Sequence, residues 1–180
     1  MIEVMIATAL FTVIVVISIG AVLSVAANHK RVQGMRVIVD NLSFIMEDMA
    51  RNVRLGNTFH CDNSSPLNVA VSCPSGLTKL VFEGVNGDPA VDADQIIYLI
   101  SQTNNQVLKS KDGGTTYSNL TEVGEVTMDL LRSGFIVTGA ESGDNTATRV
   151  IIRLSGVIHF GGIDSPFDLQ TTVSPRQAGA

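Results

Sequence analysis

The sequence predicts an α+β protein, in which one long N-terminal α-helix packs on a C-terminal antiparallel β-sheet domain. Three observations support this fold class. Residues 4–27 are apolar all round a helix, residues 35–55 place apolar side chains on one helix face, and the remainder consists of short β-rich runs separated by turns. The chain has 180 residues, so about 150 remain after a membrane helix, enough for one domain with its own core.

The first element is the apolar run at residues 4–27, which contains no charged residue. A membrane-spanning helix needs roughly 20 apolar residues, and this run exceeds that length. A secretory signal peptide is the alternative, since Ser24, Val25 and Ala26 are small or apolar residues of the type found at cleavage sites. The run lacks a basic n-region and is longer than the usual 7–15 residues or so of a signal peptide, so we favour a membrane helix.

Glu3 is the only charged residue before Lys30. A carboxylate at the N-terminal end of an apolar helix costs a few kcal/mol in lipid unless it contacts a cation or water. Glu3 therefore has two interpretations. It lies in the headgroup region and favours the positive end of the helix dipole, or it pairs with the terminal amine of a neighbouring subunit during assembly.

The segment Ile2–Phe11, with the sequence IEVMIATALF, resembles the N-terminus of type IV pilins and type II secretion pseudopilins. The closing segment, residues 167–176, and the stretch from Asn41 to Gly56 extend the resemblance more weakly. It is closest to minor subunits of the pseudopilin J or pilus W kind. In that family a basic leader ending in Gly precedes the mature chain, which usually begins with Phe-Thr, so we expect codons for such a leader upstream of Met1.

The resemblance implies a bacterial inner-membrane protein with one membrane span and an extracytoplasmic domain, which enters an extracellular filament after assembly. It also implies an assembly charge at Glu3, N-terminal processing and methylation, and three kinds of partner: other pilin or pseudopilin subunits, a prepilin peptidase and an assembly platform. Inner-membrane lipid surrounds the helix. Lys30, Arg31 and Arg36 alone would favour a cytoplasmic domain, and a basic leader would reverse that preference.

The second half of the helix is amphipathic. We expect its apolar stripe to bury against the β domain, above all at Ile38, Leu42, Ile45 and Met49, with Met35 and Val53 at its ends. Gly56 after Arg54 is a helix stop signal. These patterns divide the chain into an assembly half of the helix at residues 1–29, an amphipathic half at 30–56 and an extracytoplasmic β-sheet domain at 57–180.

Short runs rich in β-branched and apolar residues predict the strands of that domain. Their close spacing favours antiparallel hairpins. Alternation near the end of the chain places Thr148, Val150, Ile152 and Leu154 on one face, with Arg149 and Arg153 on the other. The expected strands are Leu77–Glu83, Gln95–Ser101, Gln106–Ser110, Glu125–Leu130, Phe135–Thr138, Ala147–Phe160 and Phe167–Val173.

Cys61 and Cys73 are the only cysteines. In an exported domain they would clip the loop between them, with a stabilisation of about 3 kcal/mol on the loop-entropy model. Free thiols are the second interpretation. A metal site is the third, but His60 would supply only a third ligand and a structural zinc site needs four.

The sequence offers few other candidate sites. The acidic turn with Asp88, Asp92 and Asp94 is a weak calcium candidate, because hard oxygen ligands suit that ion, but a solvated turn is the preferred interpretation. No nucleophile elbow, phosphate loop or paired-His motif occurs, so we expect neither an enzyme nor a cofactor. The basic residues are scattered and the formal net charge is −5, which argues against nucleic-acid binding.

The sequence therefore leaves two candidate functions open. The first is a structural subunit of a type IV pilus or type II secretion filament, assembled through its apolar helix. The second is a membrane-anchored extracellular binding or adhesion module that does not polymerise. Glu3 distinguishes them, because a simple anchor has no use for a carboxylate at that position.

Overall fold

The computed structural model describes residues 1–61, 69–85, 87–121, 124–141, 143 and 146–176. The chain divides into two compact units, Met1–Val37 and Ile38–Ala180, which we call the N-terminal unit and the globular unit and describe separately. The first consists of helix alone, and the second holds the last turns of that helix and all the strands.

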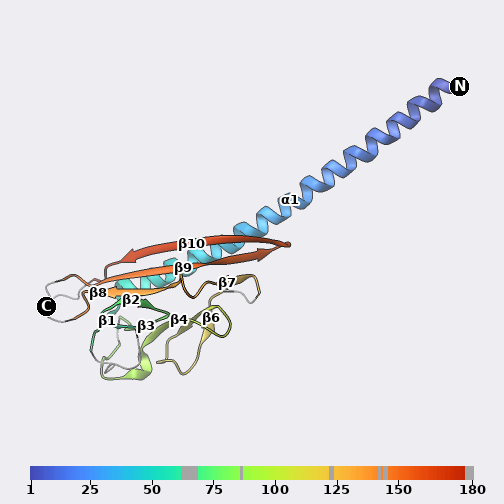
Figure 1. Cartoon of the computed structure of the whole chain (residues 1–180). Helices are drawn as coiled ribbons and strands as arrows, with labels where there is room; N and C mark the ends of the chain where they lie inside the picture. The colour runs from blue at the N-terminus through green and yellow to red at the C-terminus, as the bar shows by residue number, and fades with distance from the viewer. Residues whose placement is uncertain (62–68, 86, 122–123, 142, 144–145, 177–180) are drawn as a thin grey trace. The chain divides into compact units, whose positions relative to one another are not determined.

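Helix α1 runs from Ile2 to Leu55 (Figure 1). Within the N-terminal unit nearly every side chain is exposed, and the first buried position on the helix is Ile38. From there the buried residues follow helical spacing and form one face. They are Ile38, Leu42, Ile45, Met46, Met49 and Val53.

The helix ends where the sequence predicts, and the reason is close packing. A Cβ atom built on Gly56 would lie 2.4 Å from a ring carbon of Phe82 and 2.9 Å from the carbonyl oxygen of Glu83. Only glycine allows this approach. The backbone N–H of Arg176 then donates to the carbonyl oxygen of Arg54 at 2.9 Å, which satisfies one of the free carbonyls at the helix C-terminus.

Two antiparallel sheets make up the rest of the globular unit. One has the order β1-β3-β4-β5-β6, and the other has the order β10-β9-β8-β2 with β7 also paired to β9. A short 3₁₀ helix, η1 (Asp92–Asp94), precedes β4. The first sheet contains β1 (Asn57–His60), β3 (Lys79–Glu83), β4 (Ile96–Ile100), β5 (Val107–Ser110) and β6 (Ser118–Asn119). The second contains β2 (Cys73–Leu77), β7 (Val126–Met128), β8 (Gly134–Thr138), β9 (Arg149–Phe160) and β10 (Ile163–Val173).

The strands differ in detail from the sequence-based prediction. Strands β1, β2 and β6 were not expected, and Leu77 ends β2 instead of beginning the next strand. Strand β10 begins at Ile163, before the expected Phe167, because Gly161 and Gly162 make a two-residue turn with φ of 60° and 76°.

The long β9–β10 hairpin is the main feature of the second sheet (Figure 1). Along β9, Val150, Ile152 and Leu154 are buried while Arg149 and Arg153 are exposed, which confirms the predicted alternation. Between residues 38 and 176 the core therefore lies among the helix and two sheets. A long apolar N-terminal helix packed on antiparallel sheets is a pilin-like architecture.

Candidate anchoring and assembly site

The N-terminal unit carries the apolar surface that the sequence predicts for membrane anchoring or a signal. Glu3 lies in the first turn of α1 and is exposed. Ile2, Met5, Leu10 and Phe11 are each more than half exposed. By length and composition, α1 is the one helix among the described residues that could cross a membrane.

Three hydroxyl side chains in the apolar part of this unit, those of Thr8, Thr12 and Ser18, donate to carbonyl oxygens of the helix itself. The hydroxyl of Thr8 donates to the carbonyl oxygen of Val4 at 2.9 Å, and the hydroxyl of Ser18 donates to that of Ile14 at 2.8 Å. Such bonds remove the cost of placing a hydroxyl in a non-aqueous environment. The helix surface between them is therefore suited to lipid or to other apolar helices.

Within the globular unit, the helix packs on the rest of the unit through a buried apolar face and one polar cluster. All four residues singled out from the sequence, Ile38, Leu42, Ile45 and Met49, are at most 5% exposed. The first three line a small cavity together with Leu120, Thr121 and Val126. Leu42 and Met49 thus belong to the core, while Met35 at the start of the predicted stripe is only half-buried.

The polar cluster joins Asp48 of α1 to β4 and β5. The Nζ atom of Lys109 donates to Asp48 Oδ2, the hydroxyl of Tyr98 donates to the same oxygen at 2.9 Å, and Asn52 Nδ2 donates to the Tyr98 hydroxyl at 2.8 Å. Burial opposes ionisation of Asp48 most strongly, but the bonds from Lys109, Tyr98 and Asn52 and the Lys109 charge together lower its pKa. Burial and the neighbouring Asp48 raise the pKa of Tyr98.

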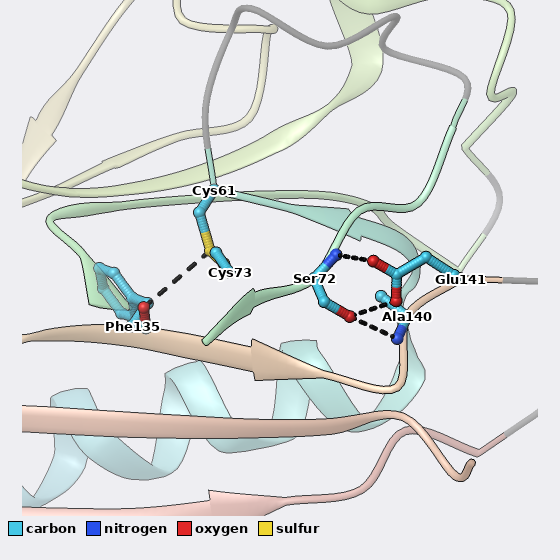
Figure 2. The surroundings of a disulfide bond; sticks show 6 residues. All are labelled: Cys61, Ser72, Cys73, Phe135, Ala140 and Glu141. Atoms are coloured by element: carbon cyan, nitrogen blue, oxygen red, sulfur yellow. Dashed lines mark hydrogen bonds between the residues drawn. A yellow bond between two sulfur atoms is a disulfide. The ribbon is translucent and has the colours of Figure 1, made fainter. Parts of the chain in front are cut away.

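Cys61 and Cys73 form a disulfide, with Cα atoms 6.2 Å apart (Figure 2). Beside Cys73, the backbone N–H of Ser72 donates to Glu141 Oε1 at 2.8 Å, and the backbone N–H of Ala140 donates to the Ser72 hydroxyl at 3.1 Å. The hydrogen bonds from the Ser72 hydroxyl and backbone lower the pKa of Glu141. Sequence reasoning missed Glu141, whose partner is 69 residues away.

The side chains of the acidic turn bond within the turn. Asp94 Oδ2 accepts the backbone N–H of Asp88 at 2.9 Å, so this carboxylate serves the turn itself. Over the described ranges, no three His, Cys, Asp or Glu side chains are grouped so as to hold a metal. The turn instead affects Glu83, a fully buried residue. Burial raises the pKa of Glu83, the charges of Asp94, Asp88 and Asp92 raise it further, and Gln95 offsets part of the rise.

A second polar arrangement was not expected from the sequence, which gives His159 no obvious partner. His159 Nε2 lies 3.0 Å from the Thr127 hydroxyl, and its Nδ1 lies 2.7 Å from Asp164 Oδ1. The order hydroxyl, imidazole, carboxylate is that of hydrolase triads. Here Thr127 pairs with Val157 in the β7–β9 ladder and the Asp164 side chain is 72% exposed, so we assign the group no catalytic role.

The chain matches no protein-family model, no curated protein and no solved structure. The description of this architecture as pilin-like is therefore based on the helix, the two sheets and the contacts between them.

Proposed function

We propose that this protein is a pilin-like structural subunit, a minor pilin or pseudopilin, of a type IV pilus or type II secretion filament. Its apolar helix is held in a bacterial inner membrane with the globular unit on the extracytoplasmic side. It then enters a filament together with other subunits. Prepilin peptidase processing and delivery by an assembly platform are part of the same proposal.

One observation carries the proposal. A single helix has an exposed apolar surface with Glu3 in its first turn, and the last turns of that same helix are built into the core of a β-rich unit. A helix used only as an anchor needs the apolar surface, and a carboxylate in its first turn offers it no more than a favourable interaction with the helix dipole. A helix that packs beside copies of similar helices gains a charge pair if a neighbour's terminal amine meets this carboxylate.

Replacing Glu3 by Gln tests this use of the charge, because the side chain keeps its shape and loses its charge. Cells carrying wild type or Glu3→Gln are fractionated, and an epitope in the exposed turn at Asn104 reports the chain in membranes and in sheared filaments. We expect equal membrane levels and a marked loss from filaments. Glu47→Gln, the same change at an exposed position of the globular unit, is the matched control.

Equal amounts of Glu3→Gln and wild type in filaments would disprove charge pairing at Glu3. Absence of the wild-type chain from every filament and secretion complex would favour the anchored binding module instead. In that case Glu3→Gln should insert as well as wild type or better, since lipid no longer has to accommodate the charge.

A further inference from the structure

Strand β10 forms the end of its sheet and leaves a long backbone edge open. Among the strands of the described residues it pairs with β9 alone, over all eleven positions from Ile163 to Val173. Among the backbone hydrogen bonds of the described residues outside the strand ladders, none involves these eleven positions. Natural sheets usually shorten, charge or cover such an edge, because it is a template for another strand.

The contacts of Ser155 show which backbone groups face outward. Ser155 stands opposite Asp168 in the ladder, yet its N–H donates to the Ser133 hydroxyl at 2.9 Å and its carbonyl oxygen accepts the Asp129 N–H at 2.8 Å. Both groups thus point away from β10. Because hydrogen-bonded and non-bonded pairs alternate in an antiparallel ladder, the N–H and carbonyl of Asp168 also point away from β9, toward the open edge.

The same alternation extends along the strand. The N–H groups of Gln170 and Thr172 share this outward direction, and Pro166 occupies an equivalent position where its missing N–H costs no ladder bond. The half of β10 near the Gly161–Gly162 turn is therefore blocked as a template by Pro166 and by the charge of Asp164. Asp168 is paired with Arg132 at 2.9 Å, and from Leu169 to Val173 the strand has neither charge nor proline.

The side chains of β10 that face the core also indicate that a further strand could be added at this edge. Phe167, Leu169 and Thr171 alternate with the exposed residues and are only half-buried, although they face the core side of the sheet. A further strand beside β10 would cover them and satisfy the outward backbone groups at the same time.

In a membrane-anchored chain, the β10 strand of a second copy is poorly suited to pair with the open edge of β10. Ile38 lines the same small cavity as Val126, which pairs with Ile158 near the start of β10. At the other end, the carbonyl oxygen of Arg54 accepts the backbone N–H of Arg176, just after β10 ends. Helix and strand thus run in the same direction. Antiparallel pairing of two β10 edges would turn the two copies' helices in opposite directions, so that both could not leave toward one membrane.

Strand β2 of a second copy, at the other end of this sheet, is also poorly suited to pair with the open edge of β10. Strand β2 runs antiparallel to β10, as a neighbour in the same orientation would require. It is only five residues long, contains Pro74 and Gly76, and has a register irregularity between Cys73 and Leu77. It cannot offer a regular ladder of backbone groups.

We propose that the open edge of β10 from Asp168 to Thr172 binds an extended strand of a different subunit in the same filament. This strand would carry apolar side chains facing Phe167 and Leu169 and no acidic residue opposite Asp168. The inference rests on the proposed function, since the partner is a filament neighbour.

Gln170→Pro is the sharpest test, because it removes one outward N–H at a position equivalent to Pro166 and leaves the β9 ladder intact. Gln170→Ala is the matched control, since it also loses the side-chain contact with Arg153 but keeps the backbone donor. We expect Gln170→Ala to enter filaments like wild type and Gln170→Pro to fall about tenfold, as for the loss of one or two hydrogen bonds, with equal membrane levels.

Hydrogen exchange of the wild-type chain gives an independent measurement that does not depend on any variant folding. The Gln170 and Thr172 amides should exchange at least about tenfold more slowly in filaments than in the detergent-extracted full chain. The ladder amides of Leu169 and Thr171 should be protected in both.

Two results would overturn the inference and leave the proposed function intact, provided that the wild-type chain is found in filaments. The first is that Gln170→Pro enters filaments as well as wild type does. The second is that hydrogen exchange at Gln170 and Thr172 is the same in filaments as in the extracted chain. Wild type absent from filaments would overturn both the inference and the proposed function. If Gln170→Pro fails to reach the membrane, the exchange measurement decides alone.

Discussion

The ammonium group of Lys109 and the carboxylate of Asp48 lie 2.5 Å apart, although 61 residues separate them in the chain. The Lys109 side chain is only 9% exposed, and its Nζ atom also lies 5.3 Å from the centre of the Tyr98 ring. This contact fixes the last turns of α1 to β4 and β5.

Asp48→Asn should destabilise the folded chain, because it leaves the Lys109 charge largely buried without a counter-charge. We expect a loss of about 1.5–3 kcal/mol in the free energy of unfolding, the range for hydrogen bonds to charged groups. Denaturant titration of the full chain in detergent at pH 7 measures it. Asp40→Asn, an exposed position on the same helix, should change stability by less than about 0.5 kcal/mol.

The same pair predicts a pH dependence. The pKa of Asp48 lies below 3.8 in the folded chain, so its ionised form stabilises the fold above the unfolded-state pKa, and this contribution is lost as pH falls below 3.8 through the folded-state pKa. The stability gap between wild type and Asp48→Asn should be constant near neutral pH and close below about pH 3.8. A gap that persists undiminished at pH 2 would contradict this assignment.

Glu83→Gln should stabilise the protein at neutral pH. Because burial and the nearby aspartates raise the Glu83 pKa above 4.5, ionisation of Glu83 costs folding free energy above the folded-state pKa and nothing below the unfolded-state value. We expect Glu83→Gln to increase the free energy of unfolding at pH 7 and to leave it unchanged below pH 4.5. Unfolding midpoints at pH 7 and pH 4 measure it, and a loss of stability at pH 7 would show that the ionised carboxylate is needed.

Leu42→Ala and Phe44→Ala distinguish the buried and exposed faces of α1. Leu42 is 1% exposed and Phe44 is 69% exposed. Removing Leu42 should cost about 2–5 kcal/mol through lost burial and a cavity, whereas Phe44→Ala should stay within about 0.5 kcal/mol for the unassembled chain. Equal effects in thermal or denaturant unfolding would mean that the helix face is assigned wrongly.

Replacing Cys61 and Cys73 by Ser should destabilise the globular unit by about 3 kcal/mol on the loop-entropy model. Mass spectrometry of the non-reduced chain should show the peptides of these two residues linked. Free alkylation of both thiols in protein purified without reductant would contradict a stable clip. Ser72→Ala, which loses only the adjacent hydroxyl bonds to Glu141 and Ala140, serves as a control for local loosening of the loop.

Sequence reasoning was most successful where a signal is local. The helix end at Leu55 follows from Gly56, and the buried positions Leu42 and Met49 follow from spacing of three and four residues. It was least successful for strands. Asn57–His60 and Cys73–Leu77 contain Pro, Gly or polar residues, so their strand character comes from pairing with distant partners and not from their own propensity.

The sequence by itself determined an apolar helix with a carboxylate at its mouth, an amphipathic continuation and a β-rich remainder, because hydrophobic periodicity depends only on neighbouring residues. The tertiary structure alone decided that Lys109 meets Asp48, that Glu83 is buried beside three aspartates, and that β10 ends its sheet with an open backbone edge. These features depend on which strands pair and in what register. Pairing is a non-local choice, set by the packing of the whole globular unit.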